Sequence, residues 1–315
     1  MIATRADRFR SVLDRFPISV RSFLQNLAQQ GGALSPRVCD EIMRLLDISV
    51  EELMIRLLPL AKVFSMASVS NFHVGAVAQV KTSPADGQTN LYVGANMEFK
   101  HLALNMSMHA EQAVVMNAWF HGAGLITSIA TSETPCGYCR QFLQELCGST
   151  DLMLLKPVGE GHDYHANRLS KILPEAFSPL DLGNDRGFMS TPKTIRKLAL
   201  IHPSDDPVVQ AALAAAVASY APYTGNLAGC ALQTPEGEIV NGGYVESVAY
   251  NPSISPLHST ILRLNLMTLA ETQAIDRIVL VEKPTRIRQK DLVEILVKSW
   301  TQNVELEYYT AQEEV

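Results

Sequence analysis

The chain has 315 residues, which is long enough for two domains that each bury a core without disulfides. Its 26 Lys and Arg residues are outnumbered by 32 Asp and Glu residues, so the net charge is −6, and the cations form no basic stripe. This argues against a protein that mainly binds the nucleic-acid backbone, because such binding needs clustered cations. We therefore expect a small-molecule partner and no nucleic acid.

The cysteines and the apolar segments indicate a cytoplasmic protein without a membrane partner. Five cysteines, an odd number, are scattered along the chain, and the first ten residues contain no apolar run of the kind found in signal peptides. The longest small-apolar stretch, 208–221, is interrupted by Gln210 and Ser219 and is too short to span a bilayer. It is better interpreted as a buried helix.

The first half of the chain begins with helices and continues with alternating strands and helices. Helices are predicted near 20–30, after Ser35-Pro36, and from Ser49, where Glu52 completes a capping box. Strands are predicted at 73–80 and 91–96, around a turn at 84–87. The elements that follow are a helix at 109–120, a strand at 125–131, a helix at 137–146 and a strand at 152–155.

The second half repeats this order after a segment rich in Pro, Gly and Asp. Its predicted elements are a helix at 207–219, strands at 227–233 and 238–245 around the turn at 235–237, a helix at 257–269, a strand at 277–282, a helix at 290–298 and a strand at 303–310. A repeated order of elements predicts an internal duplication.

The expected fold is therefore α/β: a layered α/β/α sandwich with a mixed sheet, present twice, with a small helical N-terminal extension. We predict four parts: the extension at 1–48, a catalytic domain at 49–156, a linker with little regular structure at 157–192, and a degenerate second domain at 193–315.

A residue-by-residue offset tests the duplication. Pairing Glu98 with Glu246 gives an offset of 148, and an offset of 149 applies further along, at Pro135 and Pro284. These offsets pair His109 with Leu257, Glu111 with Ser259, Cys136 with Thr285 and Cys139 with Arg288. The second copy is thus predicted to lack the chemical residues of the first and to be catalytically silent.

The central motif of the first copy is His109-Ala110-Glu111, followed 24 residues later by Cys136-Gly137-Tyr138-Cys139. Each cluster opens a predicted helix, where exposed amides and the helix dipole favour thiolate over thiol. One His and two Cys hold Zn²⁺ and leave a fourth position open for water, as in catalytic sites. Zinc lowers the pKa of that water toward neutrality. We expect one zinc ion per chain.

Glu111 lies two residues beyond the histidine, within reach of such a water molecule, and can act as a general acid and base. Together with the three ligands it indicates hydrolytic deamination. The alternative interpretation is a buried histidine with two core thiols, or a redox Cys-x-x-Cys, and neither requires His-x-Glu at a helix start. Cys147 is the nearest candidate for a fourth ligand, but it lies eight residues past Cys139, about 12 Å along a helix, and is better assigned to the core.

His-Ala-Glu with Pro-Cys-x-x-Cys resembles the signature of the zinc-dependent cytidine and deoxycytidylate deaminases. Further stretches resemble the two-domain, homodimeric cytidine deaminases of bacteria and plants: SNFHVGAV, GANMEF, HAEQ, TPCGYCRQFLQEL, LPEAFSPLDL, YAPYT and ESVAYNP. The resemblance covers most of the chain beyond about residue 50 and includes a degenerate second domain.

The resemblance implies hydrolysis of cytidine and 2′-deoxycytidine to the uridines and ammonia, with zinc-bound hydroxide attacking C4 and Glu111 moving the protons. It also implies a substrate-binding set. Asn96 and Glu98 would bind the ribose hydroxyls, Phe72 would pack on the pyrimidine, Ala110 would offer its amide to the base, and Phe177 would help to close the pocket. In the implied homodimer the degenerate domain contributes to the interface, and the Ala249-Tyr250 region reaches into the partner's site.

Two alternatives remain open. The same chemistry could act on a nucleotide, a free base or RNA. A nucleotide enzyme should have cations near Asn96 and Glu98, where the sequence offers Lys100 and His101. A non-catalytic zinc-binding protein is the alternative from another class. Glu133 stands where two-domain bacterial relatives often carry Tyr, which bears on substrate preference and not on the metal chemistry.

Overall fold

The computed structural model describes residues 3–81, 88–159, 161–190, 197–271, 273–301 and 304–314. The turn expected at 84–87 lies outside these ranges.

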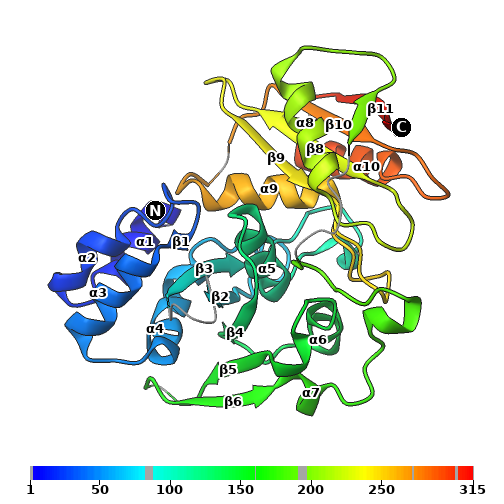
Figure 1. Cartoon of the computed structure of the whole chain (residues 1–315). Helices are drawn as coiled ribbons and strands as arrows, with labels where there is room; N and C mark the ends of the chain where they lie inside the picture. The colour runs from blue at the N-terminus through cyan, green and yellow to red at the C-terminus, as the bar shows by residue number, and fades with distance from the viewer. Residues whose placement is uncertain are drawn as a thin grey trace.

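Two sheets lie one above the other, and helices α5 and α9 run between them (Figure 1). The helices are α1 Arg5–Leu13, α2 Ile18–Leu24, α3 Pro36–Leu46, α4 Val50–Lys62, α5 Ala110–Phe120, α6 Gly137–Leu143, α7 Leu169–Ile172, α8 Pro207–Ala218, α9 Pro256–Leu266 and α10 Lys290–Trp300, with short 3₁₀ turns η1 Leu104–Met106, η2 Ser149–Asp151 and η3 Pro179–Leu182.

The first sheet is mixed, with the strand order β1-β3-β2-β4-β5-β6. Its strands are β1 Ala33–Leu34, β2 Gly75–Lys81, β3 Thr89–Ala95, β4 Ile126–Thr131, β5 Met153–Pro157 and β6 Tyr164–Arg168. Strands β4 and β5 pair in parallel, and the other pairings described in this sheet are antiparallel.

The second sheet has the order β7-β11-β10-β8-β9, and in it β10 and β11 are the parallel pair. Its strands are β7 Leu198–Leu200, β8 Ala228–Gln233, β9 Ile239–Gly243, β10 Arg277–Glu282 and β11 Leu306–Glu313. The run β9-β8-β10-β11 repeats the run β3-β2-β4-β5 in both order and direction. The structure therefore confirms the predicted duplication.

Close approaches at two glycines show how the helices layer on the first sheet. A Cβ on Gly75 would lie 2.8 Å from the Leu58 carbonyl oxygen of α4, and one on Gly94 would lie 2.3 Å from the Val114 nitrogen of α5. Gly94 pairs with Ala76, so both face one side of the sheet, and the adjacent Gly75 faces the other. Helices α4 and α5 thus cover opposite faces, which is the α/β/α sandwich that the sequence predicts. Gly229 against α8 and Gly242 against α9 repeat this arrangement in the second domain.

The N-terminal extension is helical as expected, with two differences. The sequence analysis missed α1, although Thr4 and Asp7 form a reciprocal capping box at its start. Strand β1 also lies within this segment and pairs with β3. The predicted start of α4 is confirmed, because the Ser49 hydroxyl accepts a hydrogen bond from the Glu52 amide at 3.2 Å. The predicted capping box is not complete, since the Glu52 carboxylate accepts hydrogen bonds from Arg56 instead.

The segment 157–192 contains more regular structure than expected. Strand β6 pairs antiparallel with β5 and extends the first sheet, so the prediction of little regular structure is wrong for 164–168. Composition misled the prediction there, because an exposed edge strand can be polar throughout. His165 lies on this strand opposite Lys156 and is exposed.

The equivalences between the domains differ from the constant offsets inferred from sequence. Helices α5 and α9 both have eleven residues and begin after His109 and Ser255, an offset of 146, so His109 matches Ser255 and Glu111 matches Leu257. Helices α6 and α10 begin after Cys136 and Gln289, an offset of 153. The pairings of His109 with Leu257 and Cys136 with Thr285 are therefore wrong, as are those of Glu111 with Ser259 and Cys139 with Arg288. The connecting loops differ in length, so the offset changes from one element to the next.

The two domains contact each other through reciprocal hydrogen bonds. The Gln112 side chain on α5 donates to the Pro252 carbonyl of the second domain at 3.0 Å. His258, the matching residue on α9, lies 2.7 Å from the Met106 carbonyl of the first domain through its Nε2. Met106 and Pro252 are also related by the offset of 146, so a local pseudo-twofold axis relates the two contacts.

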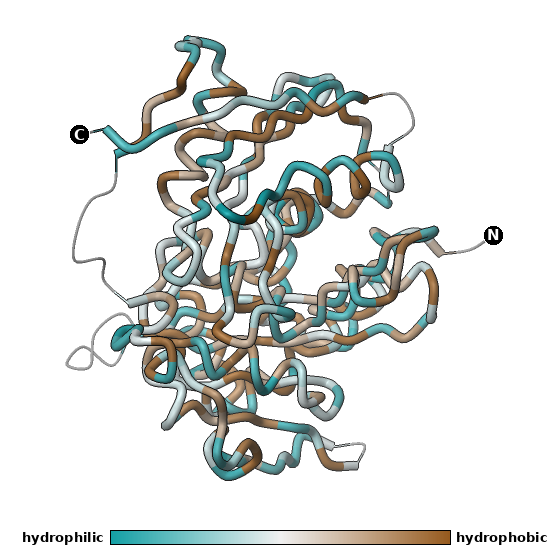
Figure 2. The backbone as a smooth tube through the Cα atoms, turned by 90° about the vertical axis from the view of Figure 1, so that its right-hand side faces the viewer, coloured by the Kyte–Doolittle hydropathy of each residue, from teal (hydrophilic) through white to brown (hydrophobic). Residues whose placement is uncertain are grey.

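The core extends through both domains. Segments of hydrophobic residues run through both halves of the molecule, whereas the residues at the C-terminal end are hydrophilic (Figure 2).

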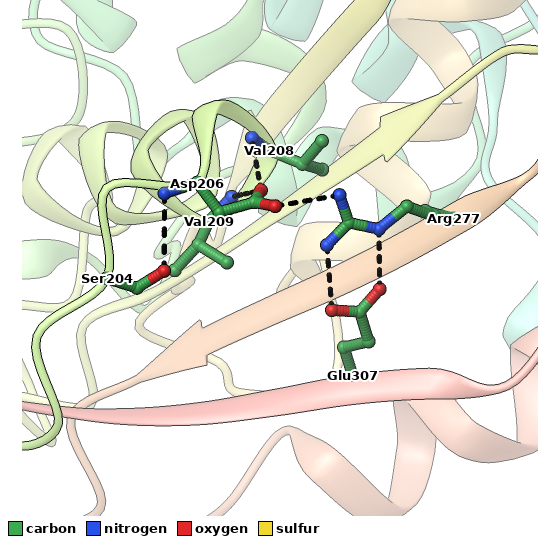
Figure 3. Close-up of polar contacts among 6 residues, drawn as sticks. All are labelled: Ser204, Asp206, Val208, Val209, Arg277 and Glu307. Carbon is green, nitrogen blue, oxygen red and sulfur yellow. Dashed lines mark hydrogen bonds and ion pairs between the residues drawn. The ribbon is translucent and has the colours of Figure 1, made fainter.

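In the second domain a polar cluster connects the start of α8 to two strands (Figure 3). Asp206 accepts hydrogen bonds from the Val208 and Val209 amides, and Arg277 bridges Asp206 at 2.9 Å and Glu307 at 2.8 Å. Among the described residues, none of the helices is long and apolar enough to cross a membrane.

Candidate active site

Three predicted metal ligands meet where two helices of the first domain begin. His109 immediately precedes α5, Cys136 immediately precedes α6, and Cys139 lies in the first turn of α6. His109 Nδ1 is 3.2 Å from Cys139 Sγ and 3.6 Å from Cys136 Sγ, and the two sulfur atoms are 3.6 Å apart. In the described part of the chain this is the one cluster of His, Cys, Asp or Glu side chains whose ligand atoms converge in this way.

The spacing of these three atoms fits a tetrahedral zinc ion. With Zn–S near 2.3 Å and Zn–N near 2.0 Å, a tetrahedron has edges of about 3.8 Å between sulfurs and about 3.5 Å between sulfur and nitrogen. The observed separations of 3.6, 3.6 and 3.2 Å are close to these values. Cys136 is exposed and Cys139 is buried, so solvent reaches the cluster on the side of Cys136. A soft, three-ligand site with one open side is typical of catalytic zinc.

The local field favours the thiolate of Cys136. The sulfur–sulfur hydrogen bond with Cys139, together with the amides of Cys139 and Tyr138 and the nearby His109, lowers the pKa of Cys136 to about 4. This hydrogen bond and burial raise the pKa of Cys139. Amides at a helix start therefore prepare the site to bind a cation.

Glu111 lies in the first turn of α5 with 4% of its surface exposed. Burial raises its pKa, while its own backbone amide, Cys139 and His109 act in the opposite direction. A buried carboxyl group with a raised pKa beside a candidate metal cluster is a candidate general acid and base. Ala110 lies between His109 and Glu111 and is buried.

Asn96 organises the loop that carries Phe72. Its Oδ1 accepts hydrogen bonds from the Ser65 hydroxyl at 2.7 Å and from the Val74 amide at 2.9 Å, and its Nδ2 donates to the Phe72 carbonyl at 2.9 Å. These contacts leave one N–H of the side-chain amide for a ligand. Phe72 itself is 57% exposed, so its ring is available for stacking.

Glu98 is held by three donors from one short loop. The Val69 and Ser70 amides donate to Oε2 at 2.8 and 2.9 Å, and the Ser70 hydroxyl donates to Oε1 at 2.5 Å. Partial burial raises the pKa of Glu98, but the hydrogen bonds from Ser70 and Val69 outweigh it, and the net shift is downward. The carboxylate is thus kept charged and in a fixed orientation.

The second domain holds Glu246 in the same way. The Tyr223 and Thr224 amides donate to one of its carboxylate oxygens, and the Thr224 hydroxyl donates to the other. The predicted equivalence of Glu98 and Glu246 is therefore confirmed by geometry. The positions that match the metal ligands are occupied by Ser255, Gln289 and Leu292, and Leu257 matches Glu111, so the second copy contains no counterpart of the cluster.

Three residues close to the ligands in sequence, Tyr138, Gln141 and Glu133, make further contacts. The Tyr138 hydroxyl donates to the Asn251 carbonyl of the second domain at 2.9 Å, and its ring centroid is 5.5 Å from that of His109. The Gln141 side chain donates to the Phe177 carbonyl at 2.7 Å, which ties the segment around Phe177 to α6. Glu133, two residues before Pro135, forms an ion pair of 3.4 Å with Lys62.

Sequence reasoning missed the roles of Ser70 and Tyr138. The position of Tyr138 between the two cysteines in the sequence did not indicate that its side chain contacts the second domain. The matched pairs Ser70 with Thr224 and Glu98 with Glu246 did contain a signal. Both copies keep a hydroxyl residue ahead of the first strand of a hairpin, β2 or β8, and a Glu after the second strand, β3 or β9.

Two stretches of the chain, residues 48–154 and 169–294, match the sequence profile of the cytidine and deoxycytidylate deaminase zinc-binding region. The chain belongs to this deaminase family. A cytidine deaminase of Aliivibrio fischeri is 36% identical to it over 261 residues, which is 82% of this chain and 83% of that protein. The cytidine deaminase of Sodalis glossinidius is 35% identical over 292 residues, 90% of each chain. The crystal structure of Mycobacterium tuberculosis cytidine deaminase is 28% identical, with a TM-score of 0.34, and covers 42% of this chain and 99% of that one.

Proposed function

We propose that the chain hydrolyses cytidine and 2′-deoxycytidine to uridine and 2′-deoxyuridine with release of ammonia. The observation that carries this proposal is the His109, Cys136 and Cys139 cluster, open to solvent on one side, with the buried Glu111 on the same helix as the histidine. Membership of the deaminase family and relatives named cytidine deaminase support the substrate class.

The three ligands would hold one Zn²⁺, which when bound supplies Lewis-acid activation of a water molecule. Glu111 would move two protons in turn, one from the attacking water to a ring nitrogen, and a second from the hydroxyl group formed at C4 to the amine, which then leaves as ammonia. Burial raises the pKa of Glu111, and this direction favours the protonated form that donates to the base. The Ala110 amide would hydrogen-bond the base edge.

The remaining site residues would bind and orient the nucleoside. Asn96 has one side-chain N–H left for a ribose hydroxyl, and Oε1 of Glu98 has a further lone pair beyond the Ser70 bond. Phe72 would stack on the pyrimidine. Phe177 is 46% exposed and lies on the segment tied to α6, from which it would help to close the pocket.

We also propose the domain division 1–48, 49–156, 157–192 and 193–315, in which the segment 157–192 adds β6 to the first sheet, and a homodimer in which the second domain contributes to the interface. Tyr250, 62% exposed, supports the expected contact of the Ala249-Tyr250 region with a partner subunit. The five cysteines are unpaired, which suits the reducing cytoplasm.

A direct test follows the ultraviolet absorbance of cytidine with the zinc-loaded protein. Glu111→Gln should abolish turnover and leave one zinc per chain, because Glu111 is not one of the ligands. Lack of turnover by the parent at one zinc per chain would overturn the proposal, and loss of zinc from Glu111→Gln would show a structural role for Glu111. Rates on cytidine, deoxycytidine, cytosine, cytidine monophosphate and a short cytidine-containing RNA would separate the nucleoside enzyme from its alternatives.

A further inference from the structure

A cavity separate from the metal cluster lies where the N-terminal helix meets both domains. Its volume is about 320 Å³. It is bordered by α1, by Met66, Ser68 and the 98–100 segment of the first domain, by α9, by the end of α10, and by Thr268, Ala270, Glu271 and Gln273. This volume is at the lower end of the range for pockets that enclose small organic ligands.

Arg5 lines this cavity as a buried cation without a partner. It is 2% exposed, and its Nε is buried with no hydrogen bond. Within the described part of the chain, its guanidinium makes no hydrogen bond or ion pair. Burial lowers the pKa of Arg5, although the charge of Glu271 acts in the opposite direction. Glu271 instead pairs with Arg8, one turn along α1, at 3.1 Å. A buried guanidinium is costly unless an anion or several acceptors satisfy it.

A second unsatisfied group borders the same cavity. The side-chain oxygen Oε1 of Gln273 is buried and has no hydrogen-bond partner among the described residues. The remaining wall includes apolar side chains, among them Phe99, Leu264 and Trp300. The cavity thus combines a cation that needs an acceptor, an acceptor that needs a donor, and an apolar surface.

The pseudo-equivalent contact between the two domains, around Glu145, shows how a buried charge is satisfied when the chain itself supplies the hydrogen-bond partners. There the buried Glu145, just after α6, accepts hydrogen bonds from the Tyr220 and Tyr223 hydroxyls, each at 2.6 Å, and from the Val248 amide at 2.7 Å. At the cavity, Ser299 near the end of α10 contacts the Lys100 carbonyl at 2.6 Å, and Lys100 matches Val248 at the offset of 148. The contact around Glu145 satisfies its buried charge with hydrogen bonds from within the chain. At the cavity, Glu271 acts on Arg5 only through its charge, and the described residues give the guanidinium no hydrogen bond or ion pair.

We propose that this cavity binds a small organic anion. Its carboxylate or phosphate would contact Arg5, a donor group would reach Gln273 Oε1, and its apolar body would lie against Phe99 and Trp300. Because Glu98 and Lys100 also line the cavity, its occupant would touch the segment that carries a proposed ribose contact. The site itself does not depend on the proposed deamination.

Trp300 provides a direct test of occupancy. The chain has two tryptophans, Trp119 and Trp300, so Trp119→Phe leaves Trp300 as the only one. The zinc-loaded Trp119→Phe protein would be titrated with 4-bromobenzoate, 4-bromophenyl phosphate and the neutral 4-bromobenzamide, whose bromine quenches nearby indole fluorescence. We expect saturable quenching by at least one anion, with an apparent Kd at least tenfold lower than that of the amide. The two anions distinguish a carboxylate ligand from a phosphate.

Two variants in the same background locate the charge. Arg5→Gln should weaken binding of the anion at least tenfold and leave the amide unchanged, whereas Arg10→Gln, at an exposed position of the same helix that does not line the cavity, should bind like the parent. Equal affinities for anion and amide, no saturable quenching by either anion, or loss of quenching on adding cytidine would each overturn the proposal. The comparison of anion with amide needs no substitution at Arg5, so it holds even if Arg5→Gln fails to fold.

Discussion

The hydroxyl of Ser70 offers a sharp test of how the substrate pocket is built. Ser70→Ala removes one of the three donors to Glu98, the bond of 2.5 Å to Oε1, and keeps the two backbone amides that hold Oε2. A hydrogen bond to a charged group contributes about 1.5–3 kcal/mol, and the partial exposure of Glu98 favours the lower end. If Glu98 binds the ribose, a loss of about 1.4 kcal/mol in binding raises KM for cytidine about tenfold. We expect kcat to change little, because the bond lies away from the reacting atoms.

The same substitution predicts a change in pH dependence. The hydrogen bonds from Ser70 and Val69 lower the pKa of Glu98 against the effect of burial, so losing one of them moves the pKa upward. A carboxylate loses its charge as the pH falls through its pKa. The KM of Ser70→Ala should therefore begin to rise at a higher pH than the KM of the parent, in steady-state assays from pH 4 to 8.

The second domain supplies a matched control. Thr224→Val removes the corresponding hydroxyl from Glu246, in an arrangement with the same donors but no metal cluster. It should lower the melting temperature without changing KM. An unchanged KM in Ser70→Ala, or an equal rise in Thr224→Val, would refute the role given to Glu98.

Three other predictions concern the metal, the packing of α5 and a buried histidine. Cys136→Ser should lose its zinc and its activity, as measured by metal analysis, and a variant that retains zinc would contradict the ligand set. Gly94→Ala and Gly242→Ala place a Cβ 2.3 and 2.5 Å from helix nitrogens, so each variant should lose about 1–3 kcal/mol of stability in urea unfolding. Gly94→Ala should also lose far more activity than Gly242→Ala, because it displaces the helix that carries His109 and Glu111. Burial lowers the pKa of His258 from 6.5 to about 4, so on acidification the unfolded chain takes up the proton before the folded chain does. The free energy of unfolding should therefore fall by up to about 3 kcal/mol as the pH drops from 6.5 to 4. His258→Gln can still donate to the Met106 carbonyl and should flatten this part of the stability profile, whereas an unchanged slope would assign the pH dependence to other groups.

The sequence predicted best what depends on neighbouring residues. Strand β10 lies at the predicted 277–282, and Ser49 caps α4 as its spacing with Glu52 indicated. The candidate metal ligands could also be found from sequence, because their positions at the starts of α5 and α6 follow from local helix signals. The α1 helix could have been found in the same way, from Thr4 and Asp7.

Relationships between distant segments were decided by the tertiary structure. The sequence indicated two copies, but loops of unequal length hid that His109 matches Ser255, because a gap in a loop changes the offset without disturbing the elements. Three other features likewise depend on which elements pack together. They are the hydrogen bond from Ser70 to Glu98, the reciprocal contacts of Gln112 and His258, and the burial of Arg5. Local patterns specify helices, strands and a candidate metal site, since these need only nearby residues. Which charge is buried, and whether it finds a partner, depends on the packing of the whole chain.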